Sequence, residues 1–111
     1  MKDFFDIWWV SRQFEFDGAT LAEAIKKTFA NRGREIVPEP LPLTAAFGED
    51  QDRKVQWRTF RRKSRLEFAP EGLQEVTTVV ATFLRPVVAA LASNQSFGGI
   101  WTPPGPWSQA P

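Results

Sequence analysis

The sequence contains no histidine, no cysteine and no tyrosine among its 111 residues. Without histidine and cysteine the chain cannot build a thiolate nucleophile, a Ser-His-Asp triad or a zinc site from the usual ligands. The absence of cysteine also excludes a disulfide, so nothing indicates an oxidising compartment. Any catalysis would therefore need carboxylates, Lys or Arg, hydroxyl groups, or a hard cation held by oxygen atoms.

The sequence also lacks a large excess of charge of one sign. Fourteen Lys and Arg residues stand against thirteen Asp and Glu residues, which gives a formal net charge of +1. We therefore expect no overall field that steers the chain to nucleic acid or to a membrane. No run approaches the roughly 20 apolar residues of a membrane span, and the N-terminal segment has no signal-peptide cleavage site. These features predict one soluble, cytoplasmic domain over residues 1–111.

Hydrophobic spacing predicts an all-α fold, a small bundle of about four helices with a Pro-rich connector and an irregular C-terminal tail. The expected helices cover residues 2–14, 20–31, 52–64 and 70–91, with a short turn through Phe47. Alternate prolines over 34–43 favour an extended connector. Pro86 is expected to kink or break the last helix after about Phe83, and no segment indicates a strand.

Local signals predict where two of these helices begin and end. Thr20 and Glu23 match a capping box, and Gly33 suits the left-handed position after the second helix. The first helix has no cap before it and is apolar around most of its circumference, so it must be covered on several sides. We therefore expect it to belong to a longer chain, and predict self-association or poor solubility without the missing part.

The first candidate site lies in this helix and comprises Lys2, Asp3 and Asp6. Carboxylates three positions apart lie on one helix face, close enough to share a divalent cation or to support acid–base chemistry. The alternative is structural, because acidic residues in a first turn are stabilised by the helix dipole. From the spacing alone, the structural interpretation is the favoured one.

The second candidate is a basic run over residues 53–65 that contains no acidic residue. Its cationic residues are Arg53, Lys54, Arg58, Arg61, Arg62, Lys63 and Arg65. Cationic side chains bind phosphates, and an exposed Trp57 or Phe60 could stack on an unpaired base, as in RNA contacts. In the alternative, the run is a solvated helix face whose Trp57 and Phe60 point into the core.

The third candidate is the Pro-rich tail over residues 100–107, which carries Trp101 and Trp107. Such a segment could bind an aromatic groove of a partner. Alternatively, its tryptophans pack back over the domain.

Several of these segments resemble the AbiEii/AbiGii family of AbiE-type nucleotidyltransferase toxins, from type IV toxin–antitoxin and abortive-infection systems. The resemblance rests on KDFFDIW at 2–8 and FEFDGATLAEAI at 14–25. The proline connector, QWR at 56–58 and PGPW at 104–107 are also similar to members of the family. The likeness spans nearly the whole chain, but only the C-terminal portion of such a toxin.

The resemblance implies a bacterial, cytoplasmic transferase that moves a nucleotidyl group from a nucleoside triphosphate to an RNA acceptor with Mg²⁺. It also implies a cognate antitoxin as a partner. Carried over to this chain, Lys2 would face phosphate, Asp3 would orient Lys2 or act as a base, and Asp6 would support the helix. Nucleotidyl transfer needs mainly charge neutralisation and positioning, which suits these residue types.

The chain departs from the family at the metal-binding element, a Gly-Ser or Gly-Gly turn followed by paired Asp residues on a strand. Asp50 and Asp52 are spaced as such a pair but are expected at a helix start. We therefore expect no metal ligands and no catalysis from this chain alone, and a separate or missing N-terminal catalytic domain as its partner. The alternatives are a stand-alone helical module that binds RNA or protein, and a non-functional remnant.

Overall fold

The computed structural model describes residues 1–37 and 40–108, and this part of the chain is mostly helical. Its α-helices are α1 (Lys2–Gln13), α2 (Gly18–Asn31), α3 (Ala45–Glu49), α4 (Gln51–Lys63) and α5 (Leu73–Ala92). A short 3₁₀ helix, η1 (Leu41–Leu43), follows the connector. The predicted all-α fold class is thus confirmed. Residues 38 and 39 of the predicted Pro-rich connector lie outside the described residues.

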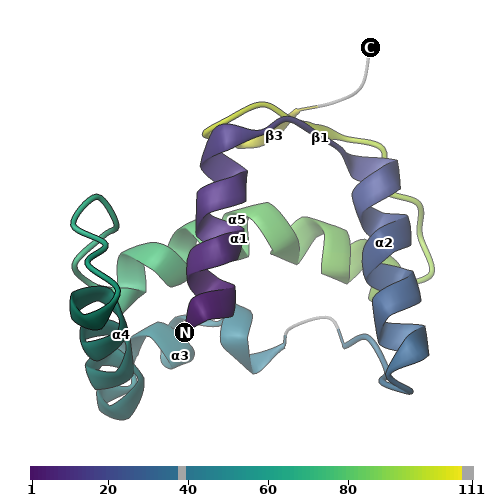
Figure 1. Cartoon of the computed structure of the whole chain (residues 1–111). Coiled ribbons are helices and arrows are strands. Elements are labelled where there is room, and N and C mark those ends of the chain that lie inside the picture. Colours follow the sequence, from purple (N-terminus) through teal and green to yellow (C-terminus); the bar gives the residue numbers. More distant parts are fainter. Residues whose placement is uncertain (38–39, 109–111) are drawn as a thin grey trace.

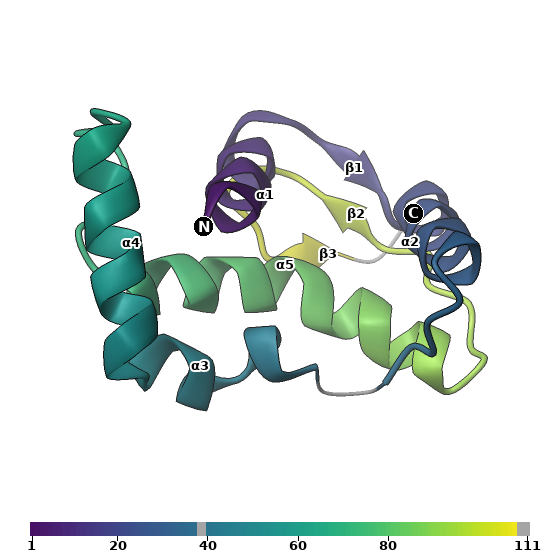
Figure 2. The ribbon, with the colours of Figure 1, turned by 60° about the horizontal axis from the view of Figure 1, so that its bottom comes forward.

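Helix α5 is the central element of the fold. It packs against α1, α2, α3, α4 and η1. Figure 1 shows α1 and α2 running in opposite directions on one side of α5, and Figure 2 shows η1 and α3 along its other side with α4 across one end. This arrangement leaves much of α1 and most of α4 at the surface.

The main core is apolar and forms where α1, α3 and α4 meet the first half of α5. Its largest fully buried member is Trp57, whose indole N–H donates to the backbone carbonyl of Pro70 at 3.0 Å. The other buried members are Trp8, Leu43, Phe47, Ala69, Leu73, Val76, Val80 and Val88. The hydrogen bond of Trp57 satisfies the one polar atom of the ring, so the whole side chain can be buried.

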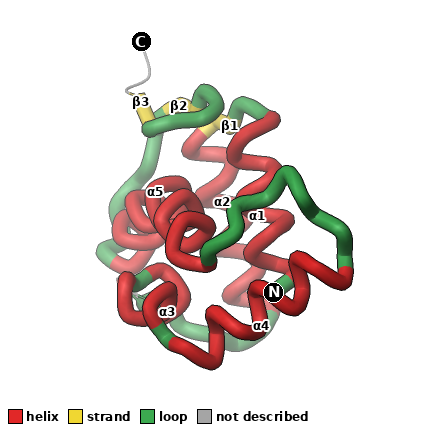
Figure 3. Tube along the Cα trace, turned by 90° about the vertical axis from the view of Figure 1, so that its left-hand side faces the viewer, coloured by secondary structure: helices red, strands yellow, loops and turns green. Residues whose placement is uncertain are grey.

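A small sheet joins the C-terminal segment to the start of α2, contrary to the prediction of no strand. Strands β1 (Phe16–Asp17), β2 (Ile100–Trp101) and β3 (Trp107–Ser108) pair antiparallel in the order β1-β2-β3. Each strand has only two residues, too short to show the period-2 pattern by which a sequence reveals a strand. Figure 3 shows the strands gathered at one end of the molecule, away from α3 and α4.

The tail packs its tryptophans back over the domain, as one of the two interpretations of the sequence predicted. Trp101 is fully buried, and its indole N–H donates to the backbone carbonyl of Ser11 at 2.6 Å. The indole N–H of Trp107 donates to the carbonyl of Phe83 at 2.7 Å. Neither side chain is therefore free to bind an aromatic groove.

The structure corrects two helix starts. Asp17, rather than Thr20, caps α2, because its carboxylate accepts from the Thr20 backbone N–H at 3.0 Å. Helix α5 begins at Leu73 after Gly72, three residues beyond the predicted start at Pro70. Gly33 has the left-handed φ of 64° expected after α2.

Pro86 does not break α5, which continues to Ala92. Proline removes the hydrogen bond to the carbonyl four residues earlier, that of Thr82. Both Pro86 and Thr82 are exposed, so water can solvate that carbonyl. The predicted break therefore does not occur.

Helix α5 is also long and apolar enough, by length and composition alone, to cross a membrane. The sequence-based statement that no run approaches this length was thus too strong. Central helices of soluble domains have the same composition, and α5 here buries Val76, Val80, Phe83 and Val87 against the surrounding elements. We therefore interpret it as a core helix.

Candidate functional site

The polar edge of α1 carries the first candidate residues, Lys2, Asp3 and Asp6. Lys2 Nζ donates to Asp6 Oδ2 at 2.6 Å, and the two side chains are 77% and 47% exposed. This hydrogen bond and the negative charge of Asp6 raise the pKa of Lys2. Lys2 is therefore a cation at neutral pH, suited to contact a phosphate and unsuited to act as a general base.

Of the two carboxylates, Asp6 is the one that contacts Lys2, because residues four positions apart on a helix lie one above the other. The resemblance gave Asp3 the role of orienting Lys2 or of acting as a base, and the orienting contact found here comes from Asp6 instead. Asp3 is exposed and adds only a smaller electrostatic contribution to the raised pKa of Lys2. Among the described residues, no group of three or more Asp or Glu side chains could hold a metal ion.

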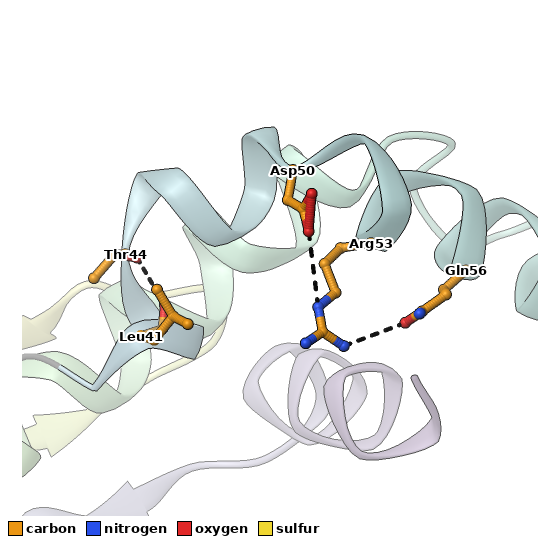
Figure 4. Close-up of polar contacts among 5 residues, drawn as sticks. All are labelled: Leu41, Thr44, Asp50, Arg53 and Gln56. Carbon is orange, nitrogen blue, oxygen red and sulfur yellow. Dashed lines mark hydrogen bonds and ion pairs between the residues drawn. The ribbon is translucent and has the colours of Figure 1, made fainter.

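The second candidate, the basic run, divides into residues with structural contacts and residues without them. Arg53 lies between Asp50, at 3.9 Å from its carboxylate, and Gln56, whose side-chain carbonyl accepts at 3.5 Å (Figure 4). Its guanidinium also lies 5.2 Å from the ring centre of Phe47. Arg53 therefore fastens the start of α4 to α3.

Arg61 has a structural role of the same kind at the other end of α4. Its Nε donates to the carbonyl of Ala69 at 3.0 Å, and its terminal nitrogen donates to the carbonyl of Glu67 at 3.1 Å. These bonds hold the loop between α4 and α5. Arg61 is only partly exposed, and it supports the surface more than it offers a cation to a ligand.

Arg58, Arg62 and Lys63 remain available at the surface of α4. All three are exposed, and no side-chain hydrogen bond or ion pair is found for them within residues 1–37 and 40–108. Arg58 and Arg62 are four residues apart, one turn of α4, and lie on the same exposed side of it, whereas Lys54 is half-buried. Arg65 is exposed just beyond the helix, with a φ of 55°.

The aromatic residues of the basic run are not available for stacking in the way that one interpretation proposed. Trp57 is fully buried and Phe60 is half-buried against Trp57, with ring centres 5.8 Å apart. The interpretation in which both point into the core is confirmed. Exposed rings occur instead at Trp9 and Phe68, which sequence reasoning missed because neither lies within the basic run.

The candidate residues on α1 and α4 line neither of two open grooves found in the described part of the chain. One groove, of about 510 Å³, lies between α5, η1 and the β3 segment and is lined by Thr78, Thr82 and Trp107 among others. Another, of about 820 Å³, lies between α2 and residues 91–98. The candidate residues on α1 and α4 thus form an open surface rather than an enclosed active site.

The comparisons with known proteins agree with the resemblance seen in the sequence. The family model of the nucleotidyl transferase AbiEii toxin, from the type IV toxin–antitoxin system, matches residues 1–82. The chain belongs to the AbiEii family. The match runs from α1 into α5 and so includes every candidate residue on α1 and α4, but it does not extend to the tail. No curated protein and no solved structure shows significant similarity to the chain.

Membership of the AbiEii family connects the chain to the toxins of type IV toxin–antitoxin systems and to nucleotidyl transfer. It also implies that a cognate antitoxin exists as a partner.

Proposed function

We propose that this chain is the helical part of an AbiEii-type nucleotidyltransferase of the bacterial cytoplasm. In this proposal α1 forms one wall of the active site and α4 contacts the RNA acceptor. The catalytic part, with the carboxylates for Mg²⁺, belongs to an N-terminal domain or a partner chain. The observation that carries the proposal is the combination of family membership with an open, exposed Lys2–Asp6 pair.

The donor set of this chain does not fit a magnesium site of its own. Mg²⁺ demands a near-octahedral set of oxygen ligands that includes one or two carboxylates. Asp6 is already engaged by Lys2, and Asp50 and Asp52 lie at the start of α4, where Asp50 faces Arg53. We therefore assign no metal ion to these residues.

Lys2 contributes positive charge to the active site. One of its three N–H donors binds Asp6, which leaves two for phosphate oxygens of the nucleoside triphosphate. Asp6 restrains the lysine side chain, so less conformational freedom is lost when a phosphate binds. A cation placed at the transferring group stabilises the charge that develops there, which is the main requirement of this chemistry.

Helix α4 contacts the phosphate backbone of the RNA. Arg58 and Arg62 present two exposed guanidinium groups on one face, and phosphate is the group that a guanidinium binds in bidentate fashion. Such contacts hold the acceptor without reading its sequence.

The test is the binding of single-stranded RNA by the chain at several salt concentrations. We expect the double variant Arg58→Ala/Arg62→Ala to bind at least about tenfold more weakly at low salt. The salt slope should fall by about 1.4, since each phosphate contact to a single strand contributes roughly 0.7. Arg61 is left unchanged because its replacement would release the loop that it holds.

The matched control is Lys26→Ala/Lys27→Ala on α2, which removes the same charge from a helix near the other end of α5 (Figure 2). Equal losses from both double variants would show attraction to charge in general and would contradict a role for α4.

A transfer assay tests the remaining part of the proposal. We expect no transfer from a labelled nucleoside triphosphate with Mg²⁺ by the chain alone, and measurable transfer by the chain alone would refute the need for a separate catalytic part. If the chain binds RNA equally well with and without the separate catalytic part, the result favours the stand-alone binding module.

A further inference from the structure

Two exposed aromatic rings from distant parts of the sequence meet beside the polar edge of α1. Trp9 is 39% exposed and Phe68 is 58% exposed. Their ring centres lie 5.3 Å apart with an interplanar angle of 65°, so the rings form a corner. Phe5 lies behind both rings, at 6.4 Å from Trp9 and 5.8 Å from Phe68. We call Trp9 and Phe68 the aromatic corner.

The aromatic corner is supported from below. Phe5 is half-buried and also contacts Phe60 of α4, with ring centres 6.2 Å apart. The backbone on both sides of Phe68 is held by Arg61, which binds the carbonyls of Glu67 and Ala69. A ring that is already held in place loses little conformational freedom on binding, which favours a binding role.

Two cations and one carboxylate lie near the aromatic corner along α1, and Asp6, three residues before Trp9, is paired with Lys2 at 2.6 Å. Lys2 and Trp9 are seven residues apart, two helical turns, and therefore lie on the same side of α1 about 10 Å apart along its axis. Arg12 is exposed one turn after Trp9, and its guanidinium lies 5.5 Å from the ring centre of Trp8. The aromatic corner thus lies between Lys2 and Arg12 along α1.

The size of the aromatic corner favours a small planar ligand over a protein. A stable protein interface buries about 800 Å² on each partner, whereas two partly exposed aromatic side chains offer only a fraction of the roughly 150–250 Å² that each can bury. A nucleobase has a π-face of the size of one such ring and carries phosphates on the same molecule.

We propose that the aromatic corner is a nucleobase-binding site, in which a base stacks on the face of one ring of the corner and meets the other ring edge-on, while its phosphates extend along α1 to Lys2. The inference rests on the proposed function, since it assigns the base to the same wall that carries the Lys2–Asp6 pair. The base belongs either to the nucleoside triphosphate or to the single-stranded acceptor, and the two have the same chemistry at this site.

The test follows the indole N–H signals of the tryptophans by NMR as ligand is added to the whole chain. Three of the five indole groups, those of Trp57, Trp101 and Trp107, donate internal hydrogen bonds and serve as internal references. Trp9→Leu assigns the signal of Trp9. The probes are ATP, the other three nucleoside triphosphates, and a short single-stranded RNA, each titrated separately.

We expect the signal of Trp9 to shift in a saturable manner while the three reference signals stay in place. A shift with triphosphates identifies the base of the nucleotide substrate, and a shift with RNA alone identifies a base of the acceptor. Trp9→Leu and Phe68→Leu should each lower the affinity for the ligand that causes the shift by at least about fivefold, because stacking on one ring contributes that much or more. Lys2→Ala should lower the affinity for phosphorylated ligands and leave the affinity for a free nucleoside unchanged.

Phe14→Leu is the matched control. Phe14 caps the end of α1, is 56% exposed, and takes part in none of the ring contacts found among the described residues. Binding that is equally weakened by this variant, or unaffected by Trp9→Leu and Phe68→Leu, overturns the proposal. A Trp9 signal that responds only to protein concentration also overturns it, in favour of a second copy of the chain.

The outcome is separable from that of the proposed function. RNA binding that depends on Arg58 and Arg62 without a response of Trp9 refutes the aromatic corner and leaves the role of α4 intact. If the Trp9 signal responds to triphosphate and the α4 variants have no effect on RNA binding, the role of α4 is refuted and the aromatic corner remains.

Discussion

At the scale of single residues, the same charged residue type has different roles according to its contacts. Arg61 holds the carbonyls of a loop, whereas Arg62, the next residue and about 100° further around the helix, is exposed. The sequence shows both as members of one basic run and cannot separate them. Lys2 shows the same dependence, because its pKa is raised by the carboxylate that the helix brings within 2.6 Å.

Asp17 gives a pH-dependent prediction at this scale. The hydroxyl and the backbone N–H of Thr20 both donate to its carboxylate and lower its pKa. A lowered pKa in the folded state means that this stabilisation is present above the ordinary Asp pKa of about 4 and is lost as the pH falls through the lowered value. We expect Asp17→Ala to lower the Tm at pH 7, with a difference from the parent that shrinks below about pH 4.

Thermal unfolding followed by circular dichroism at several pH values measures this difference. Glu15→Ala is the control, since Glu15 is an exposed carboxylate two residues earlier for which no side-chain hydrogen bond or ion pair is found among the described residues. A difference for Asp17→Ala that stays constant down to pH 2 would contradict the role of the ionised carboxylate.

At the scale of elements, periodic apolar spacing located the helices well, and the errors lie at their ends and in the tail. Helix α5 could be predicted because its buried residues recur every three or four positions, as Val76, Val80, Phe83 and Val87 do. The course of the tail depends on contacts that span many residues, such as that between Trp101 and Ser11. Such contacts leave no local pattern in the sequence.

The tail gives the prediction at this scale. Trp101→Ala should lower the free energy of unfolding by about 3–5 kcal/mol, because it removes a fully buried ring that contacts Phe83 and Trp107. Equilibrium unfolding in urea measures this loss. The exposed neighbour Thr102→Ala should change the stability by less than about 0.5 kcal/mol.

Should Trp101→Ala fail to fold, Trp101→Phe retains most of the ring and loses the N–H bond to Ser11. An unchanged stability in Trp101→Phe, together with a folded and stable Trp101→Ala, would show that the tail does not contribute to the fold.

At the scale of the whole molecule, charge is unevenly distributed although the net value is only +1. Seven of the fourteen cationic residues lie within residues 53–65, which leaves thirteen acidic residues against seven basic ones elsewhere. Figure 1 shows α4 at one side of the molecule, so this positive charge is concentrated on one flank. A local field can therefore attract RNA where the net charge would not.

The exposed apolar residues give a prediction for the molecule as a whole. The structure covers α1 more fully than its sequence suggested, since Trp8 is buried and Phe4, Phe5 and Ile7 are half-buried. The remaining exposed area around Trp9 is too small for a stable dimer. We expect sedimentation velocity to show a monomer at low micromolar concentration and weak association at higher concentration, reduced by Trp9→Ser.

A tight dimer at low micromolar concentration would contradict this expectation and would assign the aromatic corner to a second copy of the chain. Phe14→Ser serves as the control for a general gain in solubility.

The sequence by itself determined the helical class, the positions of α1, α2, α4 and α5, and the family, because helices and family motifs are written in local, periodic patterns. It also identified Lys2, Asp6 and the basic residues of α4 as candidates. Only the tertiary structure decided that Trp57 is a core residue, that Arg61 holds a loop, and that Trp9 meets Phe68. The physical reason is that burial and contact between distant segments arise from packing around α5, which no single stretch of sequence encodes.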